Sequence, residues 1–362
     1  MSTISPPPSK RRKLPRSPDS ASHHSPTCVS IFSHNVNGLT PYLQPPITTF
    51  FKPGAGAQGP EVVPKASLRD FLRRHNFPTM LLLQEIKINP DDGATIRALQ
   101  RAVASAEVEV DGPDYVVHLC LPSDKHNARG FGRKIYGVAS IIRREWYEEY
   151  VREVRPVTWD VEGRFLVVET HPIESRPLAI INIYAVNGTD LPYKDPANGA
   201  PIGTRHDRKL QVHRLLAAES RRLETAGFGV ILAGDMNVAR SQLDGHPKLR
   251  IVPHQHCVNR ADFERRFFDG PSRSPDASDR IMGLGMVDTF RHLHPTKKGY
   301  TYYPRSKAFG QSCDRVDMII VSKCLEDGIT KAGMLDTPAE RGPSDHVPLF
   351  AHFDFAKGSS QK

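Results

Sequence analysis

The sequence has few cysteines, no long hydrophobic run and no internal repeat of solenoid period. Its five cysteines lack the Cys-x-x-Cys spacing of structural zinc sites, which argues against such a site and fits a reducing compartment. No apolar stretch approaches the ~20 residues that a membrane-spanning helix needs, and the N-terminus lacks the apolar segment of a secretory signal. We therefore expect a globular protein of ordinary composition with no membrane partner.

The charge of the chain is basic. The formal net charge is +9 over 362 residues, which favours a polyanionic partner such as nucleic acid. Part of the excess lies in residues 1–27, a Ser- and Pro-rich stretch with almost no apolar residues, which we expect to be disordered. Within it, Lys10-Arg11-Arg12-Lys13 is typical of a nuclear localisation signal or a nucleic-acid-binding tail, so we expect a nuclear protein. A solvated charge run without function is the alternative.

Residues 28–356 show no break in composition and are predicted to form one domain, followed by a short C-terminal tail at 357–362. Apolar stretches of strand length are separated both by short turns and by helical segments. That mixture indicates two stacked, mixed β-sheets covered by helices, an α/β or α+β sandwich. The expected strands cover 29–35, 79–85, 115–119, 137–142, 165–169, 178–184, 230–234, 300–303, 315–321 and 347–355. One expected helix starts after a cap at Ser67, and two more cover 91–106 and 207–226. Long loops are expected at 41–64, 188–206 and 240–280.

One strand ends in the stretch Gly234-Asp235-Met236-Asn237. Glycine permits a close backbone approach or an unusual φ, so Gly234 is expected to break the strand. Asp235 and Asn237, two residues apart, point the same way if the chain stays extended. A buried strand that ends in a carboxylate and a carboxamide is costly unless something binds there. On its own, however, the stretch fits an Asx turn equally well.

Other strand ends carry the same kinds of side chain. Loops that follow several strands converge at one rim of a sheet, so a set of Asp, Glu, Asn and His side chains there indicates a site. Taken singly, each residue also has a plain structural explanation, such as a turn, a solvated acid or an ion pair. The polar residues at these ends are Asn35 with Asn37, Glu85, Tyr184 with Asn187, Arg315 with Asp317, and Asp345 with His346.

This set of residues fits divalent-metal hydrolysis of a phosphodiester. Carboxylate and amide oxygens without cysteine suit a hard ion, Mg²⁺ with Mn²⁺ as a substitute, and the candidate ligands are Asn37, Glu85 and Asp345. Asp235 is the candidate general base for the attacking water. Asn237 is expected to hold Asp235 or the water, and His346, oriented by Asp317, is expected to donate to the phosphate. Asn35, Tyr184 and Asn187 are expected to supply neutral hydrogen-bond donors.

In their order along the chain, these stretches resemble the endonuclease/exonuclease/phosphatase superfamily, and most closely the exonuclease III-like apurinic/apyrimidinic (AP) endonucleases. The resemblance covers nearly all of residues 28–350. The Phe-Arg-His-Leu and Tyr-Thr-Tyr-Tyr stretches favour the AP endonuclease branch over phosphatases or deadenylases. The matching segments are 34–39, 83–87, 182–187, 234–239, 288–293, 300–303, 315–317 and 344–346.

The resemblance implies a four-layered α/β sandwich that cleaves double-stranded DNA on the 5′ side of abasic sites with Mg²⁺. It leaves open an additional 3′-5′ exonuclease or 3′-phosphodiesterase activity on blocked 3′ ends. It assigns metal-site roles to Asn37, Glu85 and Asp345, and catalytic roles to Tyr184, Asp235, Asn237, Asp317 and His346. The residues implied to bind substrate are Asn35, Lys87, Asn187, Tyr302 and Arg315.

The chain departs from the family pattern at two positions. Asn37 stands where several members have an aspartate, so one negative charge is lost from the metal site. Asp314 stands where a tryptophan often precedes the arginine, whereas Tyr302 matches one wall of the usual aromatic sugar pocket. Two alternatives therefore stay open: a relative acting on another phosphodiester or phosphomonoester, and a weakly catalytic DNA-binding protein. In either case we expect a monomer.

Overall fold

The computed structural model describes residues 27–43, 66–105, 111–128, 136–270 and 283–356. The predicted disordered tail except Thr27, nearly all of the predicted loop at 41–64 and the C-terminal tail lie outside these residues. Within them, no helix combines the length and apolar character that crossing a bilayer requires.

The first sheet has six strands, and a parallel pair lies at its centre. The N-terminal strand β1 lies beside β2 in parallel, and every other neighbouring pair in the sheet is antiparallel. In spatial order the strands are β15 (Ile329–Met334), β16 (Leu349–Asp354), β1 (Cys28–Asn35), β2 (Met80–Gln84), β4 (Val138–Arg143) and β3 (Tyr115–Cys120).

The second sheet repeats this pairing pattern with six strands of its own. Its central parallel pair is β10 and β7, and the remaining pairs are antiparallel. The hairpin expected from the short connection between 165–169 and 178–184 is present as β6 and β7. In spatial order the strands are β12 (Val287–Asp288), β14 (Asp317–Val321), β10 (Gly229–Asp235), β7 (Arg176–Tyr184), β6 (Phe165–Ile173) and β5 (Val151–Pro156).

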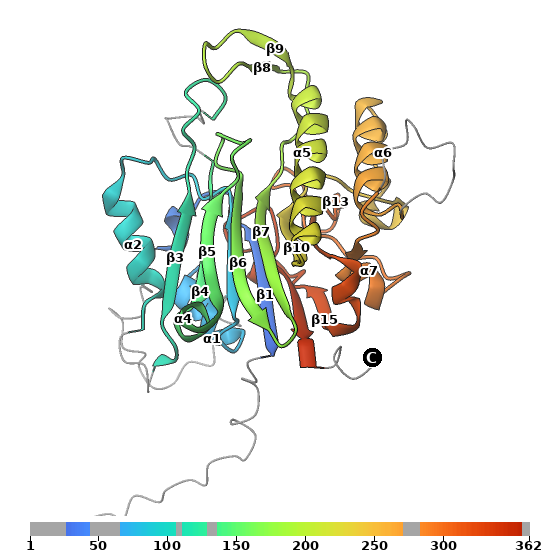
Figure 1. Ribbon diagram of the computed structural model, residues 1–362. Helices are drawn as coiled ribbons and strands as arrows, with labels where there is room; N and C mark the ends of the chain where they lie inside the picture. The colour runs from blue at the N-terminus through green and yellow to red at the C-terminus, as the bar shows by residue number, and fades with distance from the viewer. Residues whose placement is uncertain (1–26, 44–65, 106–110, 129–135, 271–282, 357–362) are drawn as a thin grey trace, which may run out of the picture.

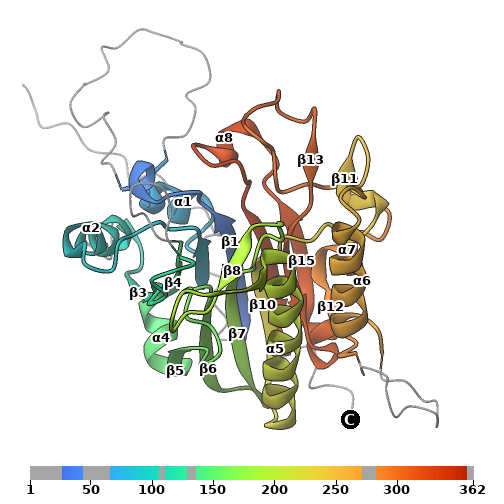
Figure 2. The same ribbon diagram turned by 90° about the horizontal axis from the view of Figure 1, so that it is seen from above.

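The sheets stack face to face, and helices cover their outer faces. Apolar side chains from both sheets, such as Ile31, Leu82, Ile180 and Ile231, form the core between them. One outer face packs against α1 (Leu68–Arg74) and α2 (Gly93–Val103), and the other packs against α5 (Arg205–Thr225) and α6 (Gln255–Phe267). Figure 2 shows the two helix pairs on opposite sides of the strands. The predicted four-layered α/β sandwich is therefore confirmed.

Local sequence explains where the predicted helices begin. The Ser67 hydroxyl accepts a hydrogen bond from the Asp70 amide, as expected of an N-cap. Thr204 and Asp207 form a reciprocal capping box that starts α5 two residues before the expected boundary. A short helix that periodicity did not predict, α4 (Arg144–Tyr150), buries Trp146 at the end of the core between the sheets.

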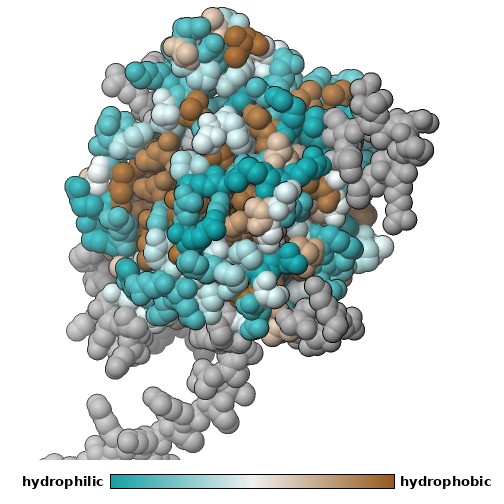
Figure 3. Space-filling model, in the orientation of Figure 1, coloured by the Kyte–Doolittle hydropathy of each residue, from teal (hydrophilic) through white to brown (hydrophobic). Residues whose placement is uncertain are grey.

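Two predicted loops contain regular structure. The segment 188–206 holds a hairpin of β8 (Pro192–Lys194) and β9 (Pro201–Thr204), which stands above the strand ends in Figure 1. Its exposed apolar side chains are Leu191, which precedes β8, and Ile202 of β9. Brown, hydrophobic atoms are visible at the top of the molecule in Figure 3. The segment 240–280 contains η5 (Gln242–Asp244), β11 (Gly245–His246) and α6. Hydrophobic periodicity does not reveal these elements, because both segments contain many prolines, glycines and charged residues.

The predicted strand at 300–303 is wrong. Tyr302 makes isolated β-bridges to Asp314 and His346, and these bridges do not extend into a strand. It lies opposite the short strand β13 (Cys313–Asp314), which pairs with β11. The remaining elements are the helix α7 (Thr289–Leu293), the helix α8 (Pro338–Arg341) and the 3₁₀ segments η2 (Thr40–Tyr42) and η6 (Lys323–Gly328).

Gly234 lies within β10 and does not break it, which corrects the expectation from sequence. The strand continues through Asp235, which pairs with Tyr184 of β7. The close approach expected of the glycine is nevertheless present. Gly234 has φ of 143°, and a Cβ atom placed there would lie 2.0 Å from the Ile183 carbonyl oxygen. Glycine therefore allows the two parallel strands to stay together at the rim.

Arg315 is buried in an ion-pair network, away from the rim. Its Nε donates to Asp244 Oδ1 at 2.6 Å and its Nη2 to Asp288 Oδ2 at 2.7 Å. Only 1% of the residue is exposed. The network ties η5 and β12 to the segment that precedes β14. The substrate-binding role expected of Arg315 is therefore replaced by a structural one.

Substituting Gly234 by alanine is expected to lower the free energy of unfolding by at least ~2 kcal/mol, because the new Cβ must displace β7 or strain β10. Urea unfolding followed by circular dichroism measures this change. The control is Gly270→Ala, where an added Cβ meets nothing within 4 Å and the change should stay within ~0.5 kcal/mol. Equal stability of the two variants would contradict the close-approach argument.

Replacing Arg315 by alanine should cost about 3–5 kcal/mol, because two buried carboxylates lose their shared cation. Burial opposes ionisation of Asp288, but Arg315 outweighs it and lowers the pKa to about 2. A carboxyl group whose pKa is lower in the folded protein than in the unfolded chain, ~3.9, stabilises the fold at pH values above that unfolded pKa. This stabilisation is lost as pH falls toward 2. The difference in free energy of unfolding between wild type and variant, measured with urea, should therefore become smaller below pH 4. The exposed Arg214→Ala is the control, and a pH-independent gap would refute the linkage.

Candidate active site

The two parallel strand pairs place their carboxyl ends at one rim, the upper one in Figure 1. Strand β1 ends at Asn35 and strand β10 ends at Asp235. Each is followed two residues later by an asparagine of positive φ, 48° at Asn37 and 52° at Asn237. The backbone amide of that asparagine donates to the side chain at the strand end, at 3.0 Å in β1 and 2.8 Å in β10. These are the Asx turns expected from sequence, and here they aim both strand ends at a common centre.

The carboxamide of Asn35 joins the two ends. Its Nδ2 donates to Glu85 Oε1 at 3.1 Å and to Asp235 Oδ2 at 3.0 Å. Its Oδ1 accepts the Asn37 amide, and none of the residue is exposed. Both amide hydrogens are thus engaged within the protein. The expected substrate contact of Asn35 is corrected to a positioning role between one carboxylate of each sheet.

The predicted metal ligands lie together on the side of the first sheet. Glu85 Oε2 lies 3.0 Å from the Lys87 ammonium, which also hydrogen-bonds Asn37 Oδ1. Asn37 Nδ2 donates to Asp345 Oδ1 at 2.9 Å. Burial opposes ionisation of Glu85, but Lys87 and hydrogen bonds outweigh it and hold its pKa below the usual value. Lys87, expected to bind substrate, therefore places its ammonium nitrogen between two of the three oxygen groups expected to bind the ion.

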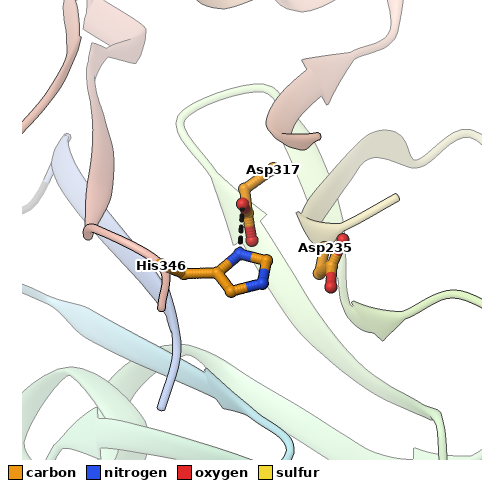
Figure 4. A group of neighbouring side chains, drawn as sticks. All are labelled: Asp235, Asp317 and His346. Atoms are coloured by element: carbon orange, nitrogen blue, oxygen red, sulfur yellow. Dashed lines mark hydrogen bonds and ion pairs between the residues drawn. The ribbon is translucent and has the colours of Figure 1, made fainter. Parts of the chain in front are cut away.

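His346 forms an ion pair with Asp317 and lies near Asp235. The imidazole Nδ1 lies 2.8 Å from Asp317 Oδ2, and Figure 4 shows the ring beside both carboxylates. Burial opposes a charge on His346, but Asp317 outweighs it and raises the pKa to about 10. This pairing favours the protonated imidazole, which donates hydrogen bonds.

Asp235 lies directly across the strand pair from Asp317. Like charges in this arrangement repel each other, and water cannot screen them because both residues are 1% exposed. Burial and the Asp317 charge accordingly raise the pKa of Asp235. Its oxygens accept hydrogen bonds from the Asn35 carboxamide and from both nitrogens of Asn237. Asp235 is thus a fixed carboxylate with a high affinity for a proton.

A cavity of about 240 Å³ opens in front of these groups. Burial and the Glu85 carboxylate raise the pKa of Tyr184 well above 10, so its hydroxyl stays neutral. The Tyr302 ring centroid lies 5.1 Å from that of the His346 ring, and both residues line the cavity. Of the predicted site residues, those that line the cavity are Glu85, Tyr184, Asn187, Asp235, Asn237, Tyr302, Asp345 and His346.

Buried polar side chains support this rim from below. Gln84 Nε2 donates to Asn182 Oδ1 across the two sheets at 2.8 Å, and Asn182 Nδ2 donates to the Ala139 carbonyl at 2.9 Å. The Ser344 hydroxyl donates to the Asn35 carbonyl at 2.6 Å and accepts the His346 amide at 3.0 Å. These bonds fix the strand ends and the turn that carries His346, so the site geometry is set by rigid elements.

Sequence reasoning missed one side of the cavity. Lys209 of α5 is buried, and its ammonium donates to the Asn237 carbonyl at 2.6 Å. Burial lowers the pKa of this ammonium to about 8. The helical spacing of α5 was visible in the sequence, but nothing local indicated which of its turns faces the site. The other missed lining residues with polar side chains are Arg250, His256, Asn259 and Arg260, whereas Asp314, which the sequence placed at the pocket, does line the cavity.

Comparison with known proteins agrees with this geometry. The chain is 30% identical over 343 residues to DNA-(apurinic or apyrimidinic site) endonuclease 2 of Mus musculus, covering 89% of this chain and 60% of that protein. It is 25% identical over 226 residues to exodeoxyribonuclease III of Haemophilus influenzae, covering 60% of this chain and 76% of that protein. The chain therefore spans less than two thirds of the mouse relative.

A solved structure shares the fold. The AP endonuclease LMAP of Leishmania major superposes with a TM-score of 0.64 at 20% identity, covering 94% of this chain and 92% of that one. The resemblance drawn from the motifs is confirmed, since residues 32–346 match the Endonuclease/Exonuclease/phosphatase family. With the strand-end carboxylates, the His346–Asp317 pair and the four-layered sandwich in place, this chain belongs to the Endonuclease/Exonuclease/phosphatase family.

Proposed function

We propose that the protein is a Mg²⁺-dependent DNA phosphodiesterase that cuts the backbone of double-stranded DNA on the 5′ side of abasic sites. The observation that supports this most is the pairing of His346 with Asp317 at 2.8 Å beside the carboxylate of Asp235. A cationic donor and a proton-accepting carboxylate facing one cavity are what hydrolysis of a phosphodiester requires. The names of the relatives favour abasic DNA as the substrate.

The oxygens around Lys87 fit a divalent cation. Glu85 Oε2 and Asn37 Oδ1 both contact one ammonium nitrogen, so they already converge on a positive centre. Asp345 adds a second carboxylate at the edge of this group. Hard oxygen ligands of this type favour Mg²⁺ or Mn²⁺, and one or two carboxylates suffice because the ion keeps several waters. When bound, the ion supplies charge stabilisation for the phosphate and for the leaving oxygen.

The protein groups then have distinct tasks. Asp235, oriented by Asn35 and Asn237, accepts the proton of the attacking water as the new P–O bond forms. The P–O3′ bond breaks, and the 3′ oxygen takes up a proton. His346 donates to a non-bridging oxygen, and the neutral Tyr184 hydroxyl is a further donor. Asp317 keeps the imidazole charged throughout.

Partner and location follow from charge. The net charge of +9 and the basic cluster at 10–13 support double-stranded DNA, with abasic sites or blocked 3′ ends, as the partner and the nucleus as the location. The same site also suits trimming of 3′ ends, since one relative is named an exodeoxyribonuclease. A second candidate substrate is another phosphoester, which the ion-paired Asp314 at the cavity wall favours.

Purified protein is expected to nick a duplex oligonucleotide containing one abasic site when Mg²⁺ is present, because one cavity is lined by Glu85, Asp235, Asp345 and His346. Denaturing gel electrophoresis of a 5′-labelled strand detects the product. EDTA should abolish nicking, and an intact duplex of the same sequence should be cut far more slowly. A folded sample that cuts no substrate in Mg²⁺ or Mn²⁺ would overturn the proposal.

The substitutions Asp235→Asn and His346→Ala should each lower kcat by roughly 10²–10⁴-fold, because each removes a proton-transfer or charge interaction of the transition state. Single-turnover cleavage measures the chemical step, and fluorescence anisotropy checks that DNA affinity changes little. The matched controls are the exposed Asp91→Asn and His171→Ala, which do not line the cavity. Retained turnover in either site variant would remove that residue from the mechanism.

A further inference from the structure

The edge strands of the two large sheets differ in how well they are protected against pairing with another chain. An open edge presents unpaired N–H and C=O groups, and proteins usually protect it with charged residues, proline, a bulge or a very short strand. Strand β12 has only two residues, and β5 carries two arginines, a glutamate and a proline. Strand β15 carries Lys331, and its register against β16 shifts beside that residue. Three of the four edges are therefore protected.

Strand β3, the fourth edge, has none of these features. Its sequence over Tyr115–Cys120 contains no acid, lysine, arginine or proline. All six of its residues pair with β4 in one unbroken register. Among the residues that the structure describes, no strand pairs with its other side. A regular, uncharged edge of this length is suited to accept an added strand.

The pairing of β3 shows which of its backbone groups face the open edge. The Arg144 amide donates to the Asp114 carbonyl at 2.9 Å, one residue before β3 begins. Hydrogen-bonded and non-hydrogen-bonded pairs alternate along an antiparallel ladder. Tyr115, Val117 and Leu119 therefore occupy the non-hydrogen-bonded pairs with β4. Their N–H and C=O groups point away from β4, where a further strand would reach them.

A groove of about 460 Å³ runs beside this edge. The first residues of β3 line it together with Arg144, the first residue of α4. Figure 1 shows α2 beside β3, on the side of the molecule away from α5 and α6. One face of α2 completes the lining, through residues that recur at helical spacing, namely Arg97, Gln100, Arg101 and Ala104.

The charge of this groove is positive. Its lining contains three arginines and one acid, Asp114. Asp114 already forms an ion pair with Arg144 at 2.8 Å. Arg97 and Arg101 are exposed, and neither has an ion pair or a hydrogen bond with another residue in the described part of the chain. Two guanidinium groups one helical turn apart thus keep their N–H donors for carboxylates.

Position and charge disfavour two other occupants of this edge. A second copy of the chain paired through β3 would bring two positive grooves together, which is repulsive. Strand β3 runs in the same direction as β1 and β2, because β4 is antiparallel to both β2 and β3. Its Cys120 end therefore lies at the catalytic rim, and the groove residues 114–117 lie toward the other end of the sheet. DNA bound at the rim leaves this groove open.

We propose that β3 and α2 form a docking site for an extended, acidic segment of a partner protein, which adds a seventh strand to the first sheet. Side chains of an added strand point alternately to its two faces. Those on the α2 side are acidic and contact Arg97 and Arg101. Those on the other side are apolar and lie near His118, whose ring packs against Tyr147 of α4. The docking site therefore recognises alternating acidic and apolar residues, and it is separate from the nuclease site.

The test uses a fluorescein-labelled peptide of four Val-Glu repeats, with binding to the full chain measured by fluorescence anisotropy. Wild type should bind it with a Kd of roughly 100 µM or tighter. The double variant Arg97→Gln/Arg101→Gln should bind at least about 10-fold more weakly, because two charge-assisted contacts are lost. The matched control is Lys297→Gln/Lys298→Gln, which removes two exposed charges from the loop after α7 and should change Kd by less than about 2-fold.

A second variant tests the backbone pairing. Val117→Pro removes an N–H that points to the open edge and spares the hydrogen bonds between β3 and β4. It should weaken binding at least about 10-fold, whereas Val117→Thr, which keeps the N–H, should bind like wild type. Circular dichroism confirms that both variants fold. The same peptide with all backbone nitrogens methylated cannot donate to β3 and should not bind, which tests pairing without altering the protein.

Several outcomes would overturn the proposal. Absence of Val-Glu binding by wild type is one, and equal binding of a Val-Lys peptide or of the methylated peptide is another. Loss of DNA affinity with unchanged peptide binding in Arg97→Gln/Arg101→Gln would assign the groove to nucleic acid. A dimer of wild type in sedimentation that Val117→Pro dissociates would assign the edge to a second copy. Abasic nicking should be unchanged in all these variants, so the result stands apart from the test of the nuclease.

Discussion

The site depends on one carboxamide, that of Asn35, which holds a carboxylate from each sheet. Glu85 follows β2 of the first sheet and Asp235 ends β10 of the second. Two buried or half-buried carboxylates this close repel each other unless donors lie between them. The two amide hydrogens of Asn35 supply those donors without adding charge. Glu85 is thereby held beside the Lys87 ammonium, and Asp235 is held as a carboxylate with a raised pKa.

The duplicated pairing pattern of the sheets makes this possible. In each sheet a central parallel pair ends at the rim, and an Asx turn redirects the chain there. The cost is visible in the backbone, since Glu85 and Lys87 have φ of 49° and 52°, which is uncommon for such side chains. It is also visible in the cross-strand pair Asp235 and Asp317. Strain and like charges concentrated at one rim are typical of sites organised for binding and catalysis.

The sequence predicted the parts of this structure that are locally encoded. Apolar runs revealed the central strands, and the polar residues that end them revealed one side of the cavity. Edge strands such as β5, with half its residues charged, and the charge-rich helix α6 carry weak periodic signals and were missed. The cationic wall was missed because tertiary packing alone brings Lys209 and Arg250 to the site. Arg315 was expected to bind substrate because it lies two residues before Asp317 at a polar strand end, and nothing local shows that its guanidinium turns into the core.

The most direct test of the claim that two strand ends form one catalytic centre is single-turnover abasic cleavage by Asn35→Asp. This change keeps the size of the side chain but places a third carboxylate between Glu85 and Asp235 and removes both donors. Loss of an orienting hydrogen bond of this kind typically costs about 10–100-fold, so turnover should fall by at least that factor while the protein stays folded. Turnover within about twofold of wild type, on the same scale, would show that the two carboxylates act without the bridge and would contradict this account.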